Sequence, residues 1–172
     1  MSEDQPSRIE SLAALGYTLP EAPSPVAAYV PAKRVGDLVY VSGQIPISGG
    51  ALLCTGRVPD EVDEKQAFEA ARQCALNGLA VLASQSSQGL EGVAEIIRIG
   101  VFVQCAPDFN RQPLIANGAS ELMESVFGND GRHVRAAVGS ISLPLNAPVE
   151  VELLARMHPE SSAAKENQND QQ

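Results

Sequence analysis

The sequence predicts an α+β fold in which one mostly antiparallel sheet of roughly six strands carries two helices on one face. Two observations lead to this prediction. Short apolar segments with a period of two alternate with two long segments of helical period, in the order β-β-α-β-α-β-β. The core must also be aliphatic, because 44% of the 172 residues are hydrophobic but only 4% are aromatic and none is Trp.

Residues 1–25 are expected to form an N-terminal extension that carries one short helix. In the segment SRIESLAALG, Ser7 precedes Glu10 by three positions, which is the spacing of a capping box, and Gly16 ends the helical pattern. The following stretch, LPEAPSP, is rich in proline and therefore favours an extended linker over a further element.

The first half of the domain is predicted to contain two strands and the longest helix. Residues 37–43 (DLVYVSG) alternate between two faces as a strand does, and residues 51–55 form a short partner strand after a Ser-Gly-Gly turn. Residues 64–84 carry small and apolar side chains at every third or fourth position, and Asp63 stands before them as the helix cap.

The second half is predicted to contain three strands and the second helix. The strands lie at residues 94–105, 134–142 and 149–157, and the helix runs from Pro107-Asp108 to Phe127. Because apolar residues occupy both faces of the strands, a single helical layer leaves one apolar face uncovered. We therefore expect the chain to oligomerise, with its sheets packed against each other.

These elements place one domain at residues 26–158, followed by a polar tail at 159–172 that is too poor in apolar side chains to order itself. No apolar run approaches the roughly 20 residues that a membrane-spanning helix needs. The first ten residues, MSEDQPSRIE, are acidic and polar, unlike a signal or transit peptide. A soluble, cytoplasmic protein is expected.

Charge and the supply of metal ligands exclude several classes of function. The formal net charge is −9, and Lys33-Arg34 is the only basic cluster, so the sequence offers no positive face for nucleic acid. The three cysteines, Cys54, Cys74 and Cys105, lack CxxC spacing, and the chain has two histidines. We therefore expect neither a disulfide framework nor a metal centre.

One arginine stands out in the segment HVRAAVGSISLPLNAPVEVELLARM. Arg135 lies at the head of a long apolar run that otherwise suits two buried strands. Its guanidinium could reach water past the strand end, pair with Asp130 or Glu150, or remain available for an anion. The residues alone leave these alternatives open.

Three motifs resemble the RidA/YjgF/endoribonuclease L-PSP family: VSGQIP at 41–46, VFV at 101–103 with the following Asp-Phe, and VRAAV with LPLNAPVEVELLA. The resemblance covers roughly residues 25–157. Within the family, the chain resembles a divergent branch with an extended N-terminus. It implies a chorismate-mutase-like fold and a homotrimer whose sheets line a central barrel. It also implies a ligand cleft between subunits, no cofactor or metal, and hydrolysis of small reactive 2-enamine or 2-imine carboxylic acids such as 2-aminoacrylate.

The resemblance assigns the two reacting positions. Arg135 matches the arginine that grips the substrate carboxylate, a task for which a planar guanidinium fork suits two oxygens. Glu150 matches the carboxylate that positions the hydrolytic water and can relay protons. Glu152 points the same way on the same strand, so both glutamates could instead belong to an exposed polar face. We favour Glu150.

The resemblance also assigns five positions around the ligand. Tyr29 matches a tyrosine that closes the cleft, and Ser42 would offer a hydroxyl, although both could be ordinary edge and strand-end residues. Gly43 would permit close backbone approach, and Asn117 aligns only if a few residues are inserted before it. Ala137 stands where the family's deaminases usually carry a cysteine, whose backbone carbonyl serves the reaction.

Ala137 keeps a second function open, that of a trimer which binds small carboxylic acids without turning them over. A ribonuclease, which the family's older name suggests, is disfavoured by the acidic character of the whole chain.

Overall fold

The computed structural model describes residues 6–22 and 29–159. Three α-helices, three short 3-10 turns and seven strands follow one another along these residues. The helices are α1 (Arg8–Ala14), α2 (Glu64–Ala83) and α3 (Gln112–Phe127), and the 3-10 turns are Gly89–Gly92, Gly128–Gly131 and Pro144–Asn146. The strands are β1 (Ala32–Val35), β2 (Leu38–Gln44), β3 (Ile47–Ser48), β4 (Ala51–Leu52), β5 (Val93–Gln104), β6 (Val134–Ser140) and β7 (Val149–Met157).

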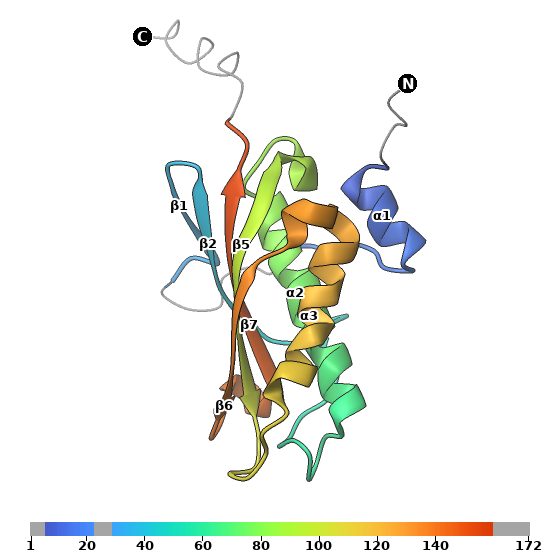
Figure 1. Cartoon of the computed structure of the whole chain (residues 1–172), viewed down its shortest axis with the longest axis vertical. Coiled ribbons are helices and arrows are strands. Elements are labelled where there is room, and N and C mark those ends of the chain that lie inside the picture. The colour runs from blue at the N-terminus through green and yellow to red at the C-terminus, as the bar shows by residue number, and fades with distance from the viewer. Residues whose placement is uncertain (1–5, 23–28, 160–172) are drawn as a thin grey trace, which may run out of the picture.

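The main sheet has the order β1-β2-β7-β5-β6, and α2 and α3 both cover the same face of it (Figure 1). The predicted α+β class and the single helical layer are therefore confirmed. Among the described strands, β5 and β6 are the parallel pair, and the other neighbours in the sheet are antiparallel. The parallel pair arises because α3 carries the chain from β5 back to the starting end of β6.

The prediction of about six strands in one sheet is wrong, because the main sheet has five. The strand expected at residues 51–55 shortens to β4, which folds back on β3 across Gly49 and Gly50 as a separate two-stranded ribbon. Sequence analysis missed β1, since its residues AKRV carry no run of alternating apolar side chains. As an edge strand, β1 needs only its backbone to pair with β2.

The predicted start of the second helix is also wrong by several residues. The helix begins at Gln112, with Pro113 in its first turn, whereas we expected it from Pro107-Asp108. The intervening residues form a turn in which Phe109 is buried, and the Gln112 side-chain amide donates to the Phe109 carbonyl at 2.7 Å. The caps of the other helices are as predicted: Ser7 and Asp63 each form a capping box.

The core lies between the sheet and the two long helices. Alternate residues of β2, β5 and β7 face the helices and are fully or almost fully buried, among them Val39, Ile99 and Val151. The helices cross closely, because a Cβ at Gly118 of α3 would lie only 2.1 Å from the carbonyl oxygen of Phe68 on α2. Glycine is therefore required at this crossing.

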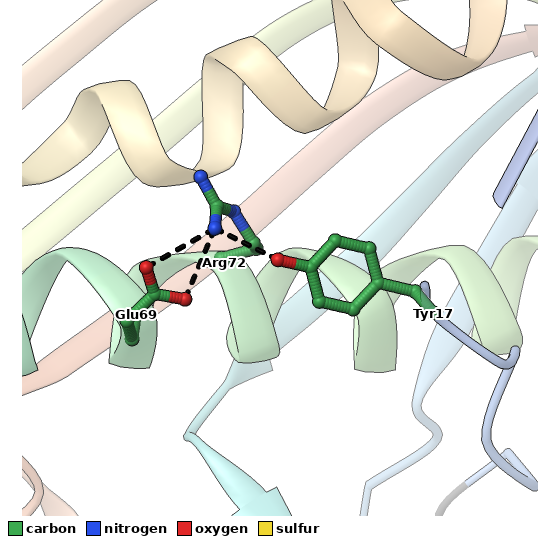
Figure 2. Close-up of polar contacts among 3 residues, drawn as sticks. All are labelled: Tyr17, Glu69 and Arg72. Atoms are coloured by element: carbon green, nitrogen blue, oxygen red, sulfur yellow. Dashed lines mark hydrogen bonds and ion pairs between the residues drawn. The ribbon is translucent and has the colours of Figure 1, made fainter. Parts of the chain in front are cut away.

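The N-terminal segment is fixed to the helical layer. The Arg8 guanidinium stacks over the Phe127 ring at 4.7 Å and donates to the carbonyls of Leu90 and Val93. Figure 2 shows a second attachment, in which Arg72 of α2 donates to the Tyr17 hydroxyl at 2.8 Å while also pairing with Glu69. Residues 6–22, the described part of the extension, thus lie over the helices, away from the uncovered face of the sheet.

The uncovered face carries both apolar and charged side chains, whereas we expected it to be apolar. Tyr40, Val134 and Val138 expose about half or more of their surface there. Between them lie two ion pairs, Arg98 with Glu152 at 2.6 Å and Arg156 with Glu95 at 2.8 Å. The expected packing of a second copy on this face remains a prediction. Within the described residues, no helix is long and apolar enough to cross a membrane.

Gly118→Ala is expected to lower the free energy of unfolding by roughly 1–3 kcal/mol, since the added methyl group forces α2 and α3 apart. Urea unfolding followed by circular dichroism measures the change. Glu121→Ala, on the exposed side of the same helix, is the matched control. Equal stability of the Gly118 variant and the wild type would show that the helix crossing adapts without cost.

Candidate functional site

Arg135 lies on the edge strand β6 and points toward the helical layer, since its register partner on β5 is the buried Ile99. Its guanidinium meets α3. Nη1 donates to Asn117 Oδ1 at 2.9 Å and to Ser120 Oγ at 3.0 Å, and Nη2 donates to the Pro113 carbonyl at 3.2 Å. The three acceptors lie on one stripe of α3 and are all uncharged. They orient the guanidinium without neutralising it.

Neither of the ion pairs considered for Arg135 forms. Over residues 6–22 and 29–159, Arg135 makes no salt bridge with a carboxylate, including those of Asp130 and Glu150. The residue is exposed and borders a cavity of about 250 Å³. The other residues that line this cavity are Ser120, Glu124, Gly131, Arg132 and His133. Of the three alternatives for Arg135, a positioned cation open to an anion fits these contacts best.

Ala137 follows Arg135 on the same face of β6. Its register partner is the buried Val101, and its side chain packs against the edge of the hydrophobic core. The side chain at this position therefore points inward.

Glu150 lies on the other face of the sheet, since Val149 and Val151 on either side of it are buried under the helices. Its carboxylate covers the backbone of Gly43, where a Cβ would come within 1.7 Å of Glu150 Oε1. Burial, and secondly repulsion from Glu152, raise the pKa of the Glu150 carboxyl above its usual range. The glycine thus lets an unpaired, partly desolvated carboxyl lie flat on β2.

The two glutamates of β7 differ in their partners. Glu152 Oε1 accepts a hydrogen bond from Arg98 Nη1 at 2.6 Å, whereas no described cation pairs with Glu150. The Glu152 carboxylate is therefore committed to the Arg98 guanidinium. This difference supports the choice of Glu150 over Glu152.

The remaining candidates are Ser42 and Tyr29. Ser42 precedes Gly43 and uses its hydroxyl to donate to the Pro31 carbonyl at 3.2 Å. This contact is of the strand-end kind that we considered as its alternative role. Tyr29 is about half exposed, with a relative accessibility of 52%, and stands next to residues outside the described part of the chain.

The candidate residues therefore form two groups. Arg135, Asn117 and Ala137 belong to the helical side of β6, and Glu150 with Gly43 belongs to the uncovered face of β7 and β2. Because β5 lies between β6 and β7, the two groups are separated by two strand spacings, roughly 10 Å, and by the thickness of the sheet. One chain brings Asn117 to Arg135 and Gly43 to Glu150, but it does not bring Arg135 to Glu150.

Sequence analysis missed Ser120 and the role of His133. The His133 ring contacts the Gly131 carbonyl through Nδ1 at 2.6 Å and Ser120 Oγ through Nε2 at 2.9 Å. The available signal was the His-Val-Arg spacing, which places His133 and Arg135 on the same side of an extended segment. Nothing in the sequence indicated that Ser120 of α3 would stand between them.

Among the cysteines, Cys74 lies next to β7, where its thiol donates to the Val149 carbonyl at 3.5 Å. Burial raises the pKa of the Cys74 thiol well above its usual value, as suits a core residue on α2. In the described part of the chain, no cluster of three or more His, Cys, Asp or Glu residues could hold a metal ion.

Comparison with known proteins now identifies the family. A family model described as "YjgF/chorismate mutase-like, putative endoribonuclease" matches residues 9–157. The chain belongs to this family. The match begins inside α1, so it includes much of the N-terminal extension as well as the sheet and the long helices.

Several relatives cover most of the chain. Protein TCP17 of Trypanosoma cruzi is 39% identical over 150 residues, covering 86% of this chain and 92% of that protein. A 2-iminobutanoate/2-iminopropanoate deaminase of Dermatophagoides farinae is 31% identical over 134 residues, covering 77% and 88%. The crystal structure of protein Atu1372 of Agrobacterium tumefaciens, of unknown function, is 42% identical with a TM-score of 0.83, covering 88% and 92%.

Glu150→Gln is expected to raise the free energy of unfolding at neutral pH and to leave it unchanged in acid. The folded protein keeps this proton to a higher pH than the unfolded chain does, so ionisation of Glu150 destabilises the fold as pH rises through the raised pKa. Thermal unfolding of both proteins between about pH 4 and pH 8 measures the difference, with exposed Glu121→Gln as control. A loss of stability at neutral pH would mean that Glu150 has a cationic partner.

Proposed function

We propose that this protein hydrolyses small, reactive 2-imine or 2-enamine carboxylic acids to 2-keto acids and ammonia. The observation that carries the proposal is the Arg135 guanidinium, which α3 holds in place beside a cavity and which forms no ion pair with a carboxylate of the described residues. Membership of the family and the deaminase of Dermatophagoides farinae support the same chemistry.

The reacting site would form between two copies of the chain. Arg135 and Glu150 cannot meet on one small ligand within a single chain, because they lie on opposite faces of the sheet. A second copy that places its Glu150 group beside the Arg135 group of the first would complete the site. We propose that this assembly is the homotrimer that the family resemblance implies.

In such a site each group has a distinct task. Arg135 holds the substrate carboxylate through two hydrogen bonds, which fixes the adjacent imine carbon. The Glu150 carboxyl of the other copy and the Ala137 carbonyl hold a water molecule against that carbon. An enamine substrate first takes up a proton on carbon and loses one from nitrogen, which converts it to the imine.

The hydrolysis itself needs one water molecule and proton relays. Water attacks the imine carbon as the nitrogen accepts a proton, which gives a carbinolamine. The carbinolamine expels ammonia as its hydroxyl loses a proton, which leaves the 2-keto acid. The raised pKa of the Glu150 carboxyl supports its proposed task of accepting and returning the proton.

Binding without turnover is the second candidate function. It would use the same Arg135 group, and Ala137 favours it because the usual thiol of the family's deaminases is missing at this position. The inward direction of the Ala137 side chain weakens this argument, since a thiol there would also point toward the core. Ribonuclease activity remains disfavoured, because the acidic chain provides no basic face for phosphates.

A coupled assay tests the proposal. A dehydratase that releases 2-aminoacrylate is mixed with the protein, and semicarbazide competes for the intermediate. Arg135→Ala is expected to lower kcat/KM by about 100-fold, and Arg135→Lys is expected not to restore it, because lysine cannot bind both carboxylate oxygens in one plane. Arg111→Ala, which removes an exposed arginine paired with Glu64, is the control.

Glu150→Gln is expected to lower kcat by about 100-fold with little change in KM, as loss of a proton relay does. Hydrolysis at the uncatalysed rate in the presence of wild-type protein would end the proposal. If a keto acid nevertheless binds and Arg135→Ala abolishes the binding, the non-catalytic function takes its place.

Mixed oligomers test whether two copies build each site. Neither Arg135→Ala nor Glu150→Gln protein should be active alone. When the two are co-expressed in equal amounts and assemble at random, about a quarter of the sites receive an intact Arg135 from one copy and an intact Glu150 from its neighbour. Recovery of that share of wild-type activity is expected. No recovery from verified mixed oligomers would show that each site belongs to one chain.

A further inference from the structure

A continuous chain of hydrogen bonds runs from the backbone to Arg135. Its members are the Gly131 carbonyl, the His133 ring, the Ser120 hydroxyl and the Arg135 guanidinium, with successive distances of 2.6, 2.9 and 3.0 Å. Gly131 and His133 lie in the segment that leads into β6, Arg135 lies in β6 itself, and Ser120 belongs to α3. The chain therefore connects the two elements between which the guanidinium lies.

The two ends of this chain fix the direction of its outer hydrogen bonds, and the protonation of the His133 ring fixes the direction of the middle one. The Gly131 carbonyl can only accept, so His133 Nδ1 carries a proton. In the neutral ring Nε2 then carries a lone pair, and the Ser120 hydroxyl donates to it. The lone pairs of Ser120 Oγ are left to accept from Arg135 Nη1, which can only donate. The imidazole thus orients the serine, and the serine orients the arginine.

The contacts with α3 account for three of the five N–H donors of Arg135. Both hydrogens of Nη1 go to Asn117 and Ser120, and one hydrogen of Nη2 goes to the Pro113 carbonyl. No described residue accepts from Nε, so Nε–H and one Nη2–H remain. Because the three acceptors share one stripe of α3, they occupy the Nη1 side of the planar group.

We propose that Ser120 and His133 are positioning residues that turn Arg135 so that its Nε–H and one Nη2–H face a planar carboxylate edge-on. The inference rests on the proposed function for the identity of the ligand and extends it to the geometry of recognition. Two parallel N–H donors on one edge match the two oxygens of a carboxylate. A guanidinium already fixed by three acceptors loses little further freedom when that carboxylate binds.

The same geometry gives Asn117 a different role from the one expected. Its Oδ1 accepts from Arg135 Nη1, so Asn117 helps to hold the arginine. Glu124 and Arg132 also border the cavity, but the 3.6 Å contact between Arg132 and Glu124 leaves the hydrogen bonds of Arg135 untouched.

Two substitutions at His133 each preserve only one of the two hydrogen bonds that the ring makes. Asparagine at this position can still donate to the Gly131 carbonyl but is too short to reach Ser120, whereas glutamine offers an oxygen to the Ser120 hydroxyl. Pyruvate binding to the full-length protein, measured by calorimetry, is expected to weaken about tenfold in Ser120→Ala and in His133→Asn, as loss of one hydrogen bond to a charged group implies. His133→Gln is expected to recover most of the affinity.

Two controls accompany these variants. Glu121→Ala, on the exposed side of α3, should bind pyruvate as the wild type does. Pyruvamide, which has no carboxylate, should not distinguish Ser120→Ala from the wild type. Undiminished pyruvate binding by Ser120→Ala would overturn the inference, as would equal weakening by His133→Asn and His133→Gln.

Nitrogen NMR of the ligand-free protein tests the positioning without reference to the ligand. At alkaline pH, His133 is expected as the neutral tautomer protonated on Nδ1, and the Arg135 Nε–H signal should be sharp in the wild type and broadened in Ser120→Ala. The Nε2-protonated tautomer, or an Nε–H signal that Ser120→Ala leaves unchanged, would overturn the inference. If wild-type protein binds no pyruvate, the proposed function fails, and these signals alone decide the positioning.

Discussion

Strand alternation is the constraint on which the candidate site depends. Successive side chains of a strand point to opposite faces, so the register that buries Val149 and Val151 forces Glu150 onto the uncovered face. The register of β6 with β5 forces Arg135 toward the helices. A slip of one residue in either strand would expose the core, and for that reason the separation of these two groups is as firmly fixed as the core itself.

Glycines give the uncovered face its chemistry. A Cβ at Gly43 or at Gly100 would collide with a glutamate of β7, so each glycine makes a flat area on which a carboxylate lies. The two carboxylates differ in their electrostatic surroundings. Over Gly100, Glu152 reaches Arg98 and forms an ion pair. Over Gly43, Glu150 meets no cation of the described residues and becomes partly desolvated, and its pKa rises. Two glutamates on the same face of one strand thus have different partners.

Local signals predicted the helices better than the strands or the site. Capping boxes at Ser7 and Asp63 depend on spacings of three residues, which the sequence displays directly. The edge strand β1 depends on backbone pairing with β2, to which its side chains contribute little pattern. In the same way, the residues of the site could be named from motifs, but their division between two faces required the strand order β7-β5-β6. The contact of Ser120 with His133 joins α3 to the segment before β6, and no periodic pattern in the sequence indicates it.

The division of the site also bears on the symmetry of an assembly. A two-fold contact uses the same surface of both copies, so it would have to reach both faces of the sheet at once to join Arg135 with Glu150 in both directions. A head-to-tail contact needs only the Arg135 side of one copy and the Glu150 side of the next. When such a contact closes on itself it makes a ring, and a ring of three would hold three equivalent sites.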